Sequence, residues 1–317
     1  MARFVCCGEV LIDLVRQPGG DSTSSRWAGL SGGSPLNTAV ALARLGRPVR
    51  MLTRLGQDGF GAQLADHLSG SGVDLSWARR VDQPTTLAVV SLDDQGRASY
   101  AFHFDGTSSF GWTPEDLPEP QSDSWLHLAS IGWMVEPAAT VLRQWLEATA
   151  TGWAGLSYDV NVRPSVIADP DHYWAQVAPL AQTVGRAGGL IKASDEDLAF
   201  LSRAQACPAG DVQAVAQGWM ELWRPAAVVV TCGSDGAVAV DRQNRLQTCP
   251  GRPVQLVDTV GAGDTFTAGF LDRYVDAPDD LAAALAWAVA AASLVCQRQG
   301  ADPPTAAEVT AWAGPQI

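Results

Sequence analysis

The sequence predicts an α/β protein organised around a doubly wound, mostly parallel β-sheet. Segments typical of strands alternate with segments of helical spacing along most of the 317 residues, as in a parallel sheet covered by helices. The strand segments are nearly continuous apolar runs, which is expected for strands buried on both faces. One stretch departs from this order. Two segments of alternating polarity, 85–94 and 98–106, flank a polar turn at 94–97 and indicate an antiparallel hairpin.

Length and composition favour one soluble globular domain over residues 1–317. Hydrophobic residues make up 47% of the chain and charged residues 17%, and the sequence has no internal repeat or low-complexity linker. The net charge of −13 leaves no basic stripe for nucleic acid. An anionic substrate must therefore be attracted locally, by helix ends, a few arginines and a divalent cation. Lys192 is the only lysine among 21 basic residues, a bias that we attribute to genome composition.

Cysteines and apolar segments indicate a cytoplasmic protein without a membrane span. The six cysteines form no CxxC pair and no metal-ligand spacing with the four histidines, which suits a reducing compartment. The N-terminus reaches Glu9 and Asp13 too early for a signal-peptide core. The most apolar run, 281–295, is shorter than the roughly 18 residues that a membrane span needs, and it predicts a buried helix.

The N-terminal part of the chain begins with the apolar run 4–15, which predicts one buried strand closed by Asp13. The next stretch, 16–29, is rich in Gly, Ser and Pro, so we expect the chain to leave the core there. The chain returns with a helix whose start is marked by Ser34 and Pro35.

The remaining elements follow in alternation. Strands are predicted at 49–56, 125–130, 155–162 and 189–194, and a strand, a glycine turn and a second strand within 227–240. Helices are predicted at or near 58–72, 141–148, 173–181, 196–202 and 212–222, with two or three more after residue 266. We interpret the polar excursion and the hairpin together as a small β-sheet lid, formed by about 15–30 and 85–108.

The most informative stretch is 258–266, which has the sequence DTVGAGDTF. Gly261, Ala262 and Gly263 allow close approach to the backbone, and the residues after them have helical spacing. A small-residue turn before a helix N-terminus directs several N–H groups at one place, which favours an anion such as phosphate. Asp264 in this turn would repel a phosphate unless it accepted a proton from a hydroxyl attacking that phosphate. The alternative is a glycine turn in which Asp264 simply caps the helix.

Polar side chains and a glycine pair fall where the predicted strands end. They are Asp13 after the first strand, Gly32, Gly33 and Asn37 at the first helix, and Asn161 and Arg163 after the residues YDV. Such donors and acceptors around a glycine pair suit a polyol or sugar. Taken singly, Asp13 could equally cap a helix, Asn37 lie on the surface and Arg163 form a surface ion pair.

Signatures of other chemistries are missing from the sequence. There is no GxxxxGK[ST] loop, no GxGxxG after the first strand and no serine nucleophile elbow. The four histidines have no catalytic partner in the sequence. They are His67, His103, His127 and His172.

With these motifs the chain resembles the PfkB-type (ribokinase-like) carbohydrate kinases, and among them the fructokinases. DTVGAGDTF is highly specific to that family, and GGSPLNTAVALARLG followed by RLGQDGFG, within 32–61, is a second signature. GEVLID at 8–13, YDVNVRP at 158–164 and YAFHFDGTSSFGW at 100–112 are similar to the fructokinase forms of these segments. The resemblance covers nearly the whole chain and implies a ribokinase-like fold.

The resemblance implies roles for the candidate residues. Asp264 would be the catalytic base, and the N–H groups of Gly261, Ala262, Gly263 and Asp264 would hold the transferring phosphoryl group. Sugar hydroxyls would contact the set Asp13, Gly32, Gly33, Asn37, Asn161 and Arg163. ATP would lie along Lys192, Ser194, Thr231, Gly233, Gly236, Gly261, Gly263 and Val289.

The resemblance also implies ions and a partner subunit. Mg²⁺ would neutralise the phosphates and be held through water near Asp197. The family's Asn-x-x-Glu motif is Ser-Asp-Glu-Asp here, which shortens the last acid by one methylene, so Glu196 is an alternative. K⁺ would bind beside Asp258 and Thr259. Lids in this family often pair between subunits, so a homodimer through the lid is expected.

These observations predict an ATP-dependent sugar kinase that phosphorylates a primary hydroxyl of D-fructose. Its partners would be a small-molecule sugar and ATP, with no nucleic acid and no membrane. Alternative acceptors are 2-keto-3-deoxygluconate, ribose or a nucleoside, because Arg163 could bond a sugar hydroxyl or pair with a carboxylate. Outside the enzymes, the alternative is a catalytically silent sugar-binding regulator. Asp264 argues against it, since a binder has no use for a carboxylate facing phosphate.

Overall fold

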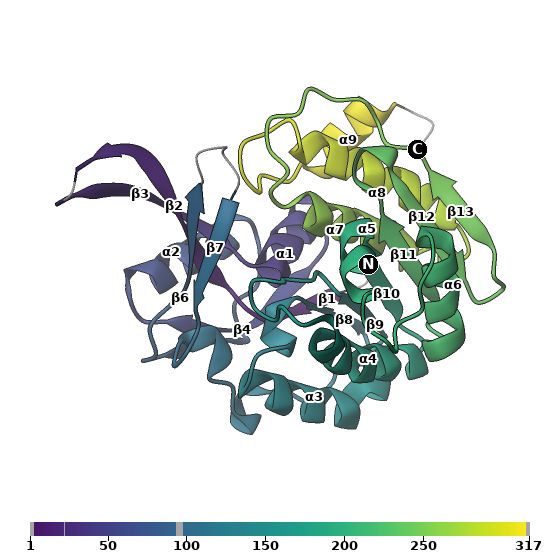
Figure 1. Cartoon of the computed structure of the whole chain (residues 1–317), viewed down its shortest axis with the longest axis horizontal. Helices are drawn as coiled ribbons and strands as arrows, with labels where there is room; N and C mark the ends of the chain where they lie inside the picture. Colours follow the sequence, from purple (N-terminus) through teal and green to yellow (C-terminus); the bar gives the residue numbers. More distant parts are fainter. Residues whose placement is uncertain (1–2, 22, 93–97, 315–317) are drawn as a thin grey trace.

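The computed structural model describes residues 3–21, 23–92 and 98–314. Within these residues the main sheet has nine strands: β1 Arg3–Cys7, β4 Val49–Gly56, β5 Ala78–Val81, β8 Ser124–Ala129, β9 Gly155–Asp159, β10 Leu190–Ser194, β11 Ala227–Thr231, β12 Ala237–Asp241 and β13 Leu246–Cys249. Their order is β13-β12-β11-β10-β9-β8-β1-β4-β5 (Figure 1). Pairing is parallel from β11 to β5 and antiparallel only between β11, β12 and β13. The predicted mostly parallel sheet is confirmed.

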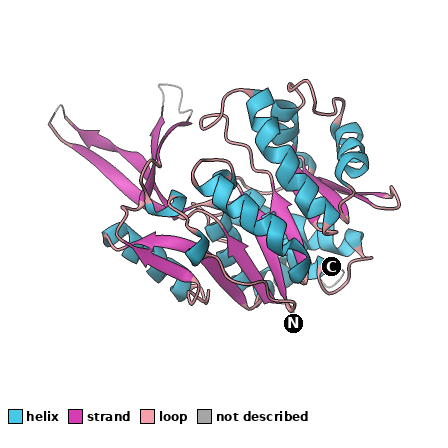
Figure 2. Cartoon of the chain, turned by 90° about the horizontal axis from the view of Figure 1, so that it is seen from below, coloured by secondary structure: helices cyan, strands magenta, loops and turns pink. Residues whose placement is uncertain are grey.

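Helices cover both faces of this sheet (Figure 2). They are α1 Ser34–Arg44, α2 Gly59–Gly70, α3 Ala138–Thr149, α4 Pro170–Arg186, α5 Asp195–Leu201, α6 Val212–Trp223, α7 Ala262–Tyr274, α8 Leu281–Val295 and α9 Ala306–Ala313. The strand pleat sends successive side chains to opposite faces. In β1, Phe4 and Cys6 join the core under α1, α7 and α8, whereas Val5 and Cys7 join the core under α3, α4 and α6. The doubly wound arrangement is therefore confirmed.

The structure corrects the prediction for the apolar run 4–15, which contains two strands and not one. β1 ends at Cys7, the chain turns at Gly8, and β2 Leu11–Gly20 begins in a second sheet. Asp13 therefore lies inside β2 and does not close the first strand. The run is mostly apolar because β1 and the start of β2 are both buried, so hydrophobicity alone does not reveal the change of sheet.

The second sheet is small and consists of β2, β3 Ser25–Gly32, β6 Thr86–Leu92 and β7 Ala98–His103, in the order β3-β2-β6-β7 among the described residues. It confirms the predicted small β-sheet, although β2 and β6 pair in parallel. The excursion after Leu14 is thus mostly strand, and the predicted turn at 94–97 lies outside the described residues. Figure 1 shows the β2–β3 hairpin projecting from the body of the molecule.

The small sheet joins the large one through short buried segments. The return from β7 passes through the 3-10 turn η1 Ser108–Phe110, where the Ser109 hydroxyl donates to the Val10 carbonyl at 2.7 Å and accepts from the Val10 N–H at 3.2 Å. The return from β3 passes through Gly33, whose φ of 111° suits glycine. A Cβ on Gly33 would lie 2.6 Å from the Glu9 carbonyl oxygen. The segment from β3 to α1 therefore packs tightly against the segment from β1 to β2.

The described helices include none that is long and apolar enough to cross a membrane. The apolar run 281–295 forms the buried helix α8, as predicted.

Candidate active site

A cleft of about 1180 Å³ runs along the carboxyl ends of the parallel strands, between the small sheet and the N-terminus of α7. Ligands of doubly wound proteins bind at this edge of the sheet. Most predicted site residues line the cleft: Asp13, Gly33, Asn37, Asn161, Arg163, Lys192, Ser194, Glu196, Asp197, Thr231, Gly233, Gly236, Thr259, Gly261, Ala262, Gly263, Asp264 and Val289. Gly32 and Asp258 are neighbours of lining residues in the sequence but do not line the cleft themselves. The structure therefore brings together groups that are far apart in the sequence.

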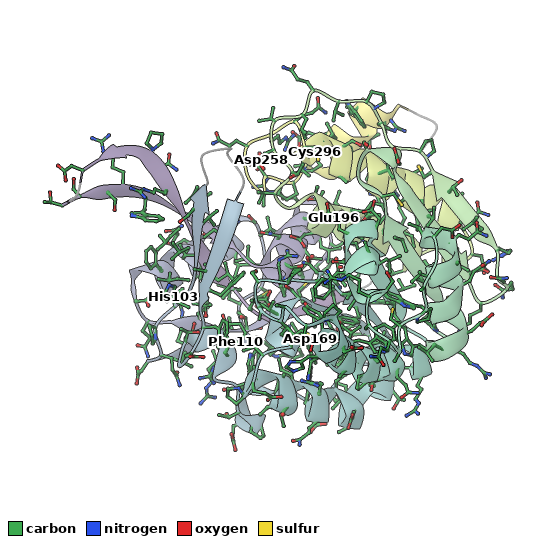
Figure 3. The ribbon with its side chains drawn as sticks, viewed as in Figure 1. His103, Phe110, Asp169, Glu196, Asp258 and Cys296 are labelled. Carbon is green, nitrogen blue, oxygen red and sulfur yellow. The ribbon has the colours of Figure 1, made fainter. Side chains whose placement is uncertain are left out.

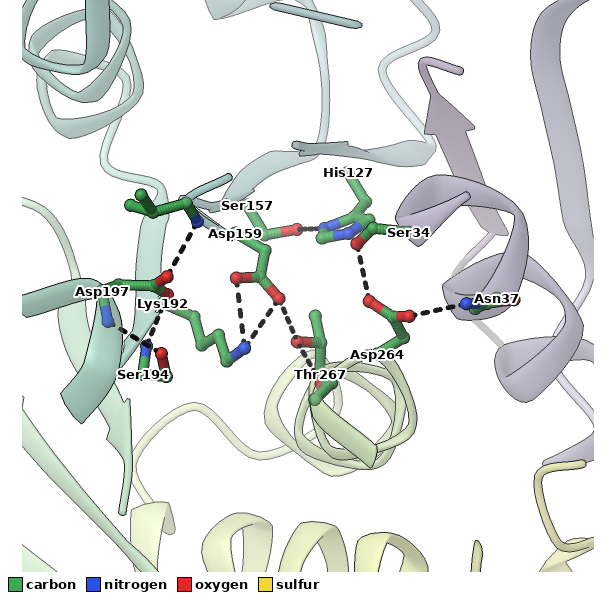
Figure 4. Close-up of polar contacts among 12 residues, drawn as sticks. Ser34, Asn37, His127, Ser157, Asp159, Lys192, Ser194, Asp197, Asp264 and Thr267 are labelled. Atoms are coloured by element: carbon green, nitrogen blue, oxygen red, sulfur yellow. Dashed lines mark hydrogen bonds and ion pairs between the residues drawn. The ribbon is translucent and has the colours of Figure 1, made fainter. Parts of the chain in front are cut away.

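Asp264 lies in the first turn of α7, directly after the glycine turn. Gly261 precedes the helix with a φ of 76°, and α7 begins at Ala262. The Ser34 hydroxyl donates to Asp264 Oδ1 at 2.6 Å, and Asn37 Nδ2 donates to Asp264 Oδ2 at 2.8 Å (Figure 4). In the part of the chain that the structure describes, both oxygens thus bond to α1 and not to the backbone of α7. This geometry does not support the alternative of a simple helix cap.

Burial decides the electrostatics of Asp264. It raises the pKa of the Asp264 carboxyl above its ordinary value, and the hydrogen bonds from Ser34 and Asn37 oppose this only in part. Asn37, expected to contact sugar, uses its amide nitrogen to hold this carboxylate. The arrangement presents a carboxylate of raised basicity next to the N–H groups at the start of a helix.

A buried ion pair lies beside the same helix turn. Lys192 Nζ is 3.1 Å and 2.9 Å from the two carboxylate oxygens of Asp159, and the Thr267 hydroxyl is 2.9 Å from Asp159 Oδ2 (Figure 4). Burial on its own lowers the pKa of Lys192, but the carboxylates of Asp159 and Asp197 more than offset this, so the pKa is raised. Sequence reasoning missed Asp159. Its signal was an acid at the end of an apolar strand, two residues before Asn161.

The opposite end of the cleft, below the small sheet, carries two acids and one arginine. Burial raises the pKa of Asp13 to about 6 and that of Glu9 to about 7, and the positive charge of Arg163 lowers both in part. Glu9 Oε2 accepts a hydrogen bond from the Gly132 N–H at 2.9 Å. Glu9 was also missed, although it follows the first strand directly. This end can both donate to and accept from several hydroxyl groups.

Ser194 and Asp197 have a structural role that the sequence did not reveal. They form a capping box at the start of α5, in which Asp197 Oδ2 accepts from the Ser194 N–H at 2.8 Å. Asp197 Oδ1 accepts from the Val162 N–H at 2.8 Å, so this carboxylate joins α5 to the segment after β9. Among the described residues no group of three or more His, Cys, Asp or Glu side chains is placed to hold a metal ion.

Asp258 connects two loops above the cleft. Its Oδ1 accepts from the Val260 N–H at 3.0 Å, and its Oδ2 accepts from the Gly300 N–H at 2.9 Å. The Cys296 carbonyl accepts from the Val257 N–H at 2.9 Å, and Figure 3 shows Asp258 and Cys296 close together there. Both carboxylate oxygens of Asp258 therefore hold backbone N–H groups, and Thr259 faces the cleft.

The far end of the cleft is glycine-rich and apolar. Thr231 ends β11, and the turn after it brings Gly236 so close to the β13 end that a Cβ would lie 2.0 Å from the Cys249 carbonyl oxygen. Val289 on α8 lines this end, together with Leu256 and Val260, two exposed side chains that the sequence did not single out. An apolar wall beside a glycine turn suits a flat base attached to phosphates.

Comparisons with known proteins identify the family and the fold of the chain. The pfkB family of carbohydrate kinases matches residues 1–308. The fructokinase of Rhizobium leguminosarum bv. trifolii is 35% identical over 271 residues, which cover 84% of this chain and 78% of that protein. A fructokinase from Vibrio cholerae in a fructose-, ADP- and calcium-bound form is 28% identical, with a TM-score of 0.82 over 99% of each chain. A fructokinase double mutant from Vibrio cholerae, in a fructose-, ADP- and potassium-bound form, has a TM-score of 0.83 at 26% identity over 99% of each chain. The chain belongs to the pfkB family of carbohydrate kinases.

Proposed function

We propose that this protein is an ATP-dependent fructokinase, which transfers the γ-phosphoryl group of ATP to a primary hydroxyl of D-fructose. The observation that carries this proposal is the buried Asp264 carboxylate, held by Ser34 and Asn37 beside the N–H groups at the start of α7. The fructose- and ADP-bound structures of the Vibrio cholerae fructokinase, which has the same fold, support it.

The proposed reaction needs one base and one anion site. Asp264 accepts the proton of the sugar hydroxyl as its oxygen attacks the γ-phosphorus, and the bond to the bridging oxygen of ADP breaks. The N–H groups of Gly261, Ala262 and Gly263, with the helix dipole behind them, stabilise charge on the phosphoryl oxygens. ATP extends from there past Ser194 and along Thr231, Gly233 and Gly236 towards Val289.

We assign the sugar to the end of the cleft below the small sheet. Asp13, Asn161 and Arg163 line it, and Gly33 and Asn37 lie at its border with the phosphoryl site. Gly32 would support this end from behind, because a Cβ there would lie 2.4 Å from Asp13 Oδ2. A neutral sugar fits an acidic protein better than an anionic keto acid does.

A sugar panel tests the proposal. kcat/KM is measured by ADP release for fructose, ribose, 2-keto-3-deoxygluconate and adenosine under one condition, and fructose is expected to give the highest value. A higher value for the keto acid, lost selectively in Arg163→Ala, would replace fructose as the acceptor and leave the kinase assignment in place. No ADP release with any acceptor would favour the sugar-binding regulator.

We propose two cations for this reaction. Mg²⁺ would neutralise the phosphates, held through water near Glu196 and Asp197, and its affinity would come mostly from the phosphates themselves. K⁺ would bind beside Asp258 and Thr259; the potassium-bound form of the Vibrio cholerae fructokinase double mutant supports a role for this ion, but not its position. Chelation by EDTA is expected to abolish turnover until Mg²⁺ is restored. Equal activity in potassium-, sodium- and tetramethylammonium-only buffers would contradict the K⁺ proposal.

We further propose that residues 1–317 act as one cytoplasmic kinase domain whose small sheet is a lid over the sugar. The lid comprises about 15–30 and 85–108, with β2 beginning somewhat earlier, at Leu11. A homodimer through this sheet is supported by the exposed side chains of Trp27 and Leu30 on β3, which pairs on one side only within the described residues.

A further inference from the structure

The single lysine of the chain is buried against the phosphoryl site. Lys192 lies near the end of β10, its side chain is 11% exposed, and its Nζ would be 3.3 Å from a Cβ placed on Gly263. The ammonium group therefore lies directly against the first turn of α7. The other 20 basic residues of the chain are arginines, so a lysine at this buried position is a clear departure from the composition.

Strand register brings Lys192 and Asp159 together. They are direct partners in the parallel pairing of β9 and β10, and Asp159 has no exposed surface. Lys192 donates to both oxygens of Asp159. A compact ammonium with three donors suits this confined space better than the planar guanidinium of arginine. The pair is thus fixed by the large sheet.

Thr267 connects this pair to α7. Its hydroxyl lies 2.9 Å from Asp159 Oδ2 and 3.0 Å from the Gly263 carbonyl oxygen one turn earlier. Gly263 and Asp264 belong to that earlier turn. These contacts connect the carboxyl ends of β9 and β10 continuously to the helix turn that carries the phosphoryl-binding N–H groups.

We propose that Lys192, Asp159 and Thr267 form a positioning unit that fixes the first turn of α7 relative to the sheet. The unit holds Asp264 and the N–H groups of Gly261 to Gly263 at the distance from the sugar that transfer requires. It acts through α7, so it changes the rate of transfer and not the affinity for sugar. Misplacement by about 1 Å can reduce a rate about 10²-fold.

Charge balance supports this assignment. Lys192 faces the carboxylates of Asp159, Asp197 and Asp264, which would otherwise repel one another and an incoming phosphate. The ammonium neutralises part of this charge without contributing a mobile side chain. The proposal rests on the kinase activity proposed above, but not on fructose as the acceptor.

The first test removes the contact between Asp159 and α7. Thr267→Val keeps the side-chain shape but lacks the hydroxyl, and is expected to lower kcat at least tenfold while the sugar KM changes less than threefold. Thr267→Ser restores the hydroxyl and most of kcat. The control is Thr38→Val on α1, where a buried hydroxyl has no hydrogen-bond partner among the described residues. Activity is measured with whichever sugar of the panel the wild type uses fastest.

A second readout does not depend on activity. Hydrogen exchange of a peptide covering 262–270 is expected to be faster in Thr267→Val than in wild type, Thr267→Ser or Thr38→Val. Absence of activity with any sugar would remove the proposed function and leave this measurement to decide on the positioning unit. Unchanged exchange, or kcat within twofold of wild type, overturns the proposal.

The ion pair itself is tested by neutralising both partners. Lys192→Met leaves the buried Asp159 carboxylate without its cation, and Asp159→Asn takes from Lys192 the carboxylate that it contacts directly, so both variants are expected to be destabilised, whereas the double variant recovers stability. The double variant is expected to keep a kcat at least tenfold below wild type with a nearly unchanged sugar KM. Recovery of kcat together with stability would show that the pair only stabilises the fold, and would overturn the proposal.

Discussion

Asp264 shows how one residue acquires a function from its surroundings. A carboxylate at a helix start is common as a cap, but this one is buried and its oxygens bond to Ser34 and Asn37 of another helix. Burial raises its pKa, which makes it a better proton acceptor than an exposed aspartate. At the same time it remains beside the N–H groups that would hold the phosphoryl group in the proposed reaction. In that reaction the residue would meet both the attacking hydroxyl and the phosphate.

We expect Asp264→Asn to lower kcat by about 10²–10⁴-fold, the range for a lost general base. The amide keeps the shape of the side chain, and its oxygen can still accept from Asn37 while its NH2 group donates to the Ser34 hydroxyl, so the fructose KM is expected to stay within about threefold of wild type. Steady-state kinetics by ADP release provide the measurement. Near-native turnover would remove Asp264 from the mechanism. In wild type, kcat/KM should fall on the acid side with a midpoint above the ordinary aspartate pKa, since burial raises the pKa of Asp264.

Glu9 makes stability depend on pH. Its pKa is raised by burial from 4.5 to about 7, so the folded chain holds a proton that the unfolded chain releases. The contribution of Glu9 to the free energy of unfolding is therefore fully present below about pH 4.5. It is lost as the pH rises towards 7, and it does not change further above that pH. Wild type is expected to lose up to about 3 kcal/mol relative to Glu9→Gln between pH 5 and pH 8, at 1.36 kcal/mol per pKa unit.

Urea unfolding at several pH values measures this difference. Gln can still accept the Gly132 N–H, so the variant differs mainly in charge. Glu147→Gln, at an exposed position of α3, serves as the control and should follow wild type at every pH. Parallel stability curves for wild type and Glu9→Gln would show that Glu9 stays ionised in the folded protein.

At the scale of elements, the site depends on how helices and strands are joined. α7 contributes its N-terminus, α1 contributes Ser34 and Asn37, and the edge of β9 and β10 contributes Asp159 and Lys192. The small sheet meets the large one at the junction of β1 and β2, where Ser109 bonds to both backbone groups of Val10. This contact replaces a strand partner at the point where the chain changes sheets.

We expect Ser109→Ala to destabilise the protein by about 1–3 kcal/mol, because it leaves two buried backbone groups of Val10 without their partner. Denaturant unfolding followed by tryptophan fluorescence measures the change. Ser108→Ala is a matched control, since Ser108 is equally buried and its hydroxyl has no partner in the described part of the chain. Equal costs for the two variants would contradict a specific role of Ser109 at the junction.

Over the whole molecule, the sequence predicts the features that depend on neighbouring residues, such as strands, helix starts and turns. Apolar runs and helix starts such as Ser34–Pro35 indicate the alternation of the large sheet, and the turn before α7 indicates an anion site. Contacts between distant segments were not predictable. The bond from Glu9 to Gly132 spans 123 residues, and the Lys192–Asp159 pair requires the register of β9 and β10. β5 was missed because it is short, and two of its four residues, ARRV, are exposed arginines.

An exposed leucine on the small sheet predicts that the protein forms a dimer. Leu30 is 47% exposed on β3 and lies opposite Asp13 of β2, so its side chain is on the face that borders the sugar. A second copy covering this face would bury Leu30 and complete the wall over the sugar, whereas Trp27 lies on the opposite face of β3. We therefore expect light scattering at micromolar concentration to give twice the chain mass of 33.4 kDa.

Leu30→Asp is expected to dissociate this dimer and to raise the fructose KM several-fold, because a charge on the buried face opposes pairing. kcat should change less, since Asp264 and α7 lie outside the small sheet. The matched control is Leu222→Asp on α6, where the leucine is 50% exposed but belongs to another part of the molecule. A wild type that is strictly monomeric would contradict the dimer. Dissociation by Leu222→Asp, with Leu30→Asp still dimeric, would place the interface on α6 and leave the small sheet to act on the sugar within a single chain.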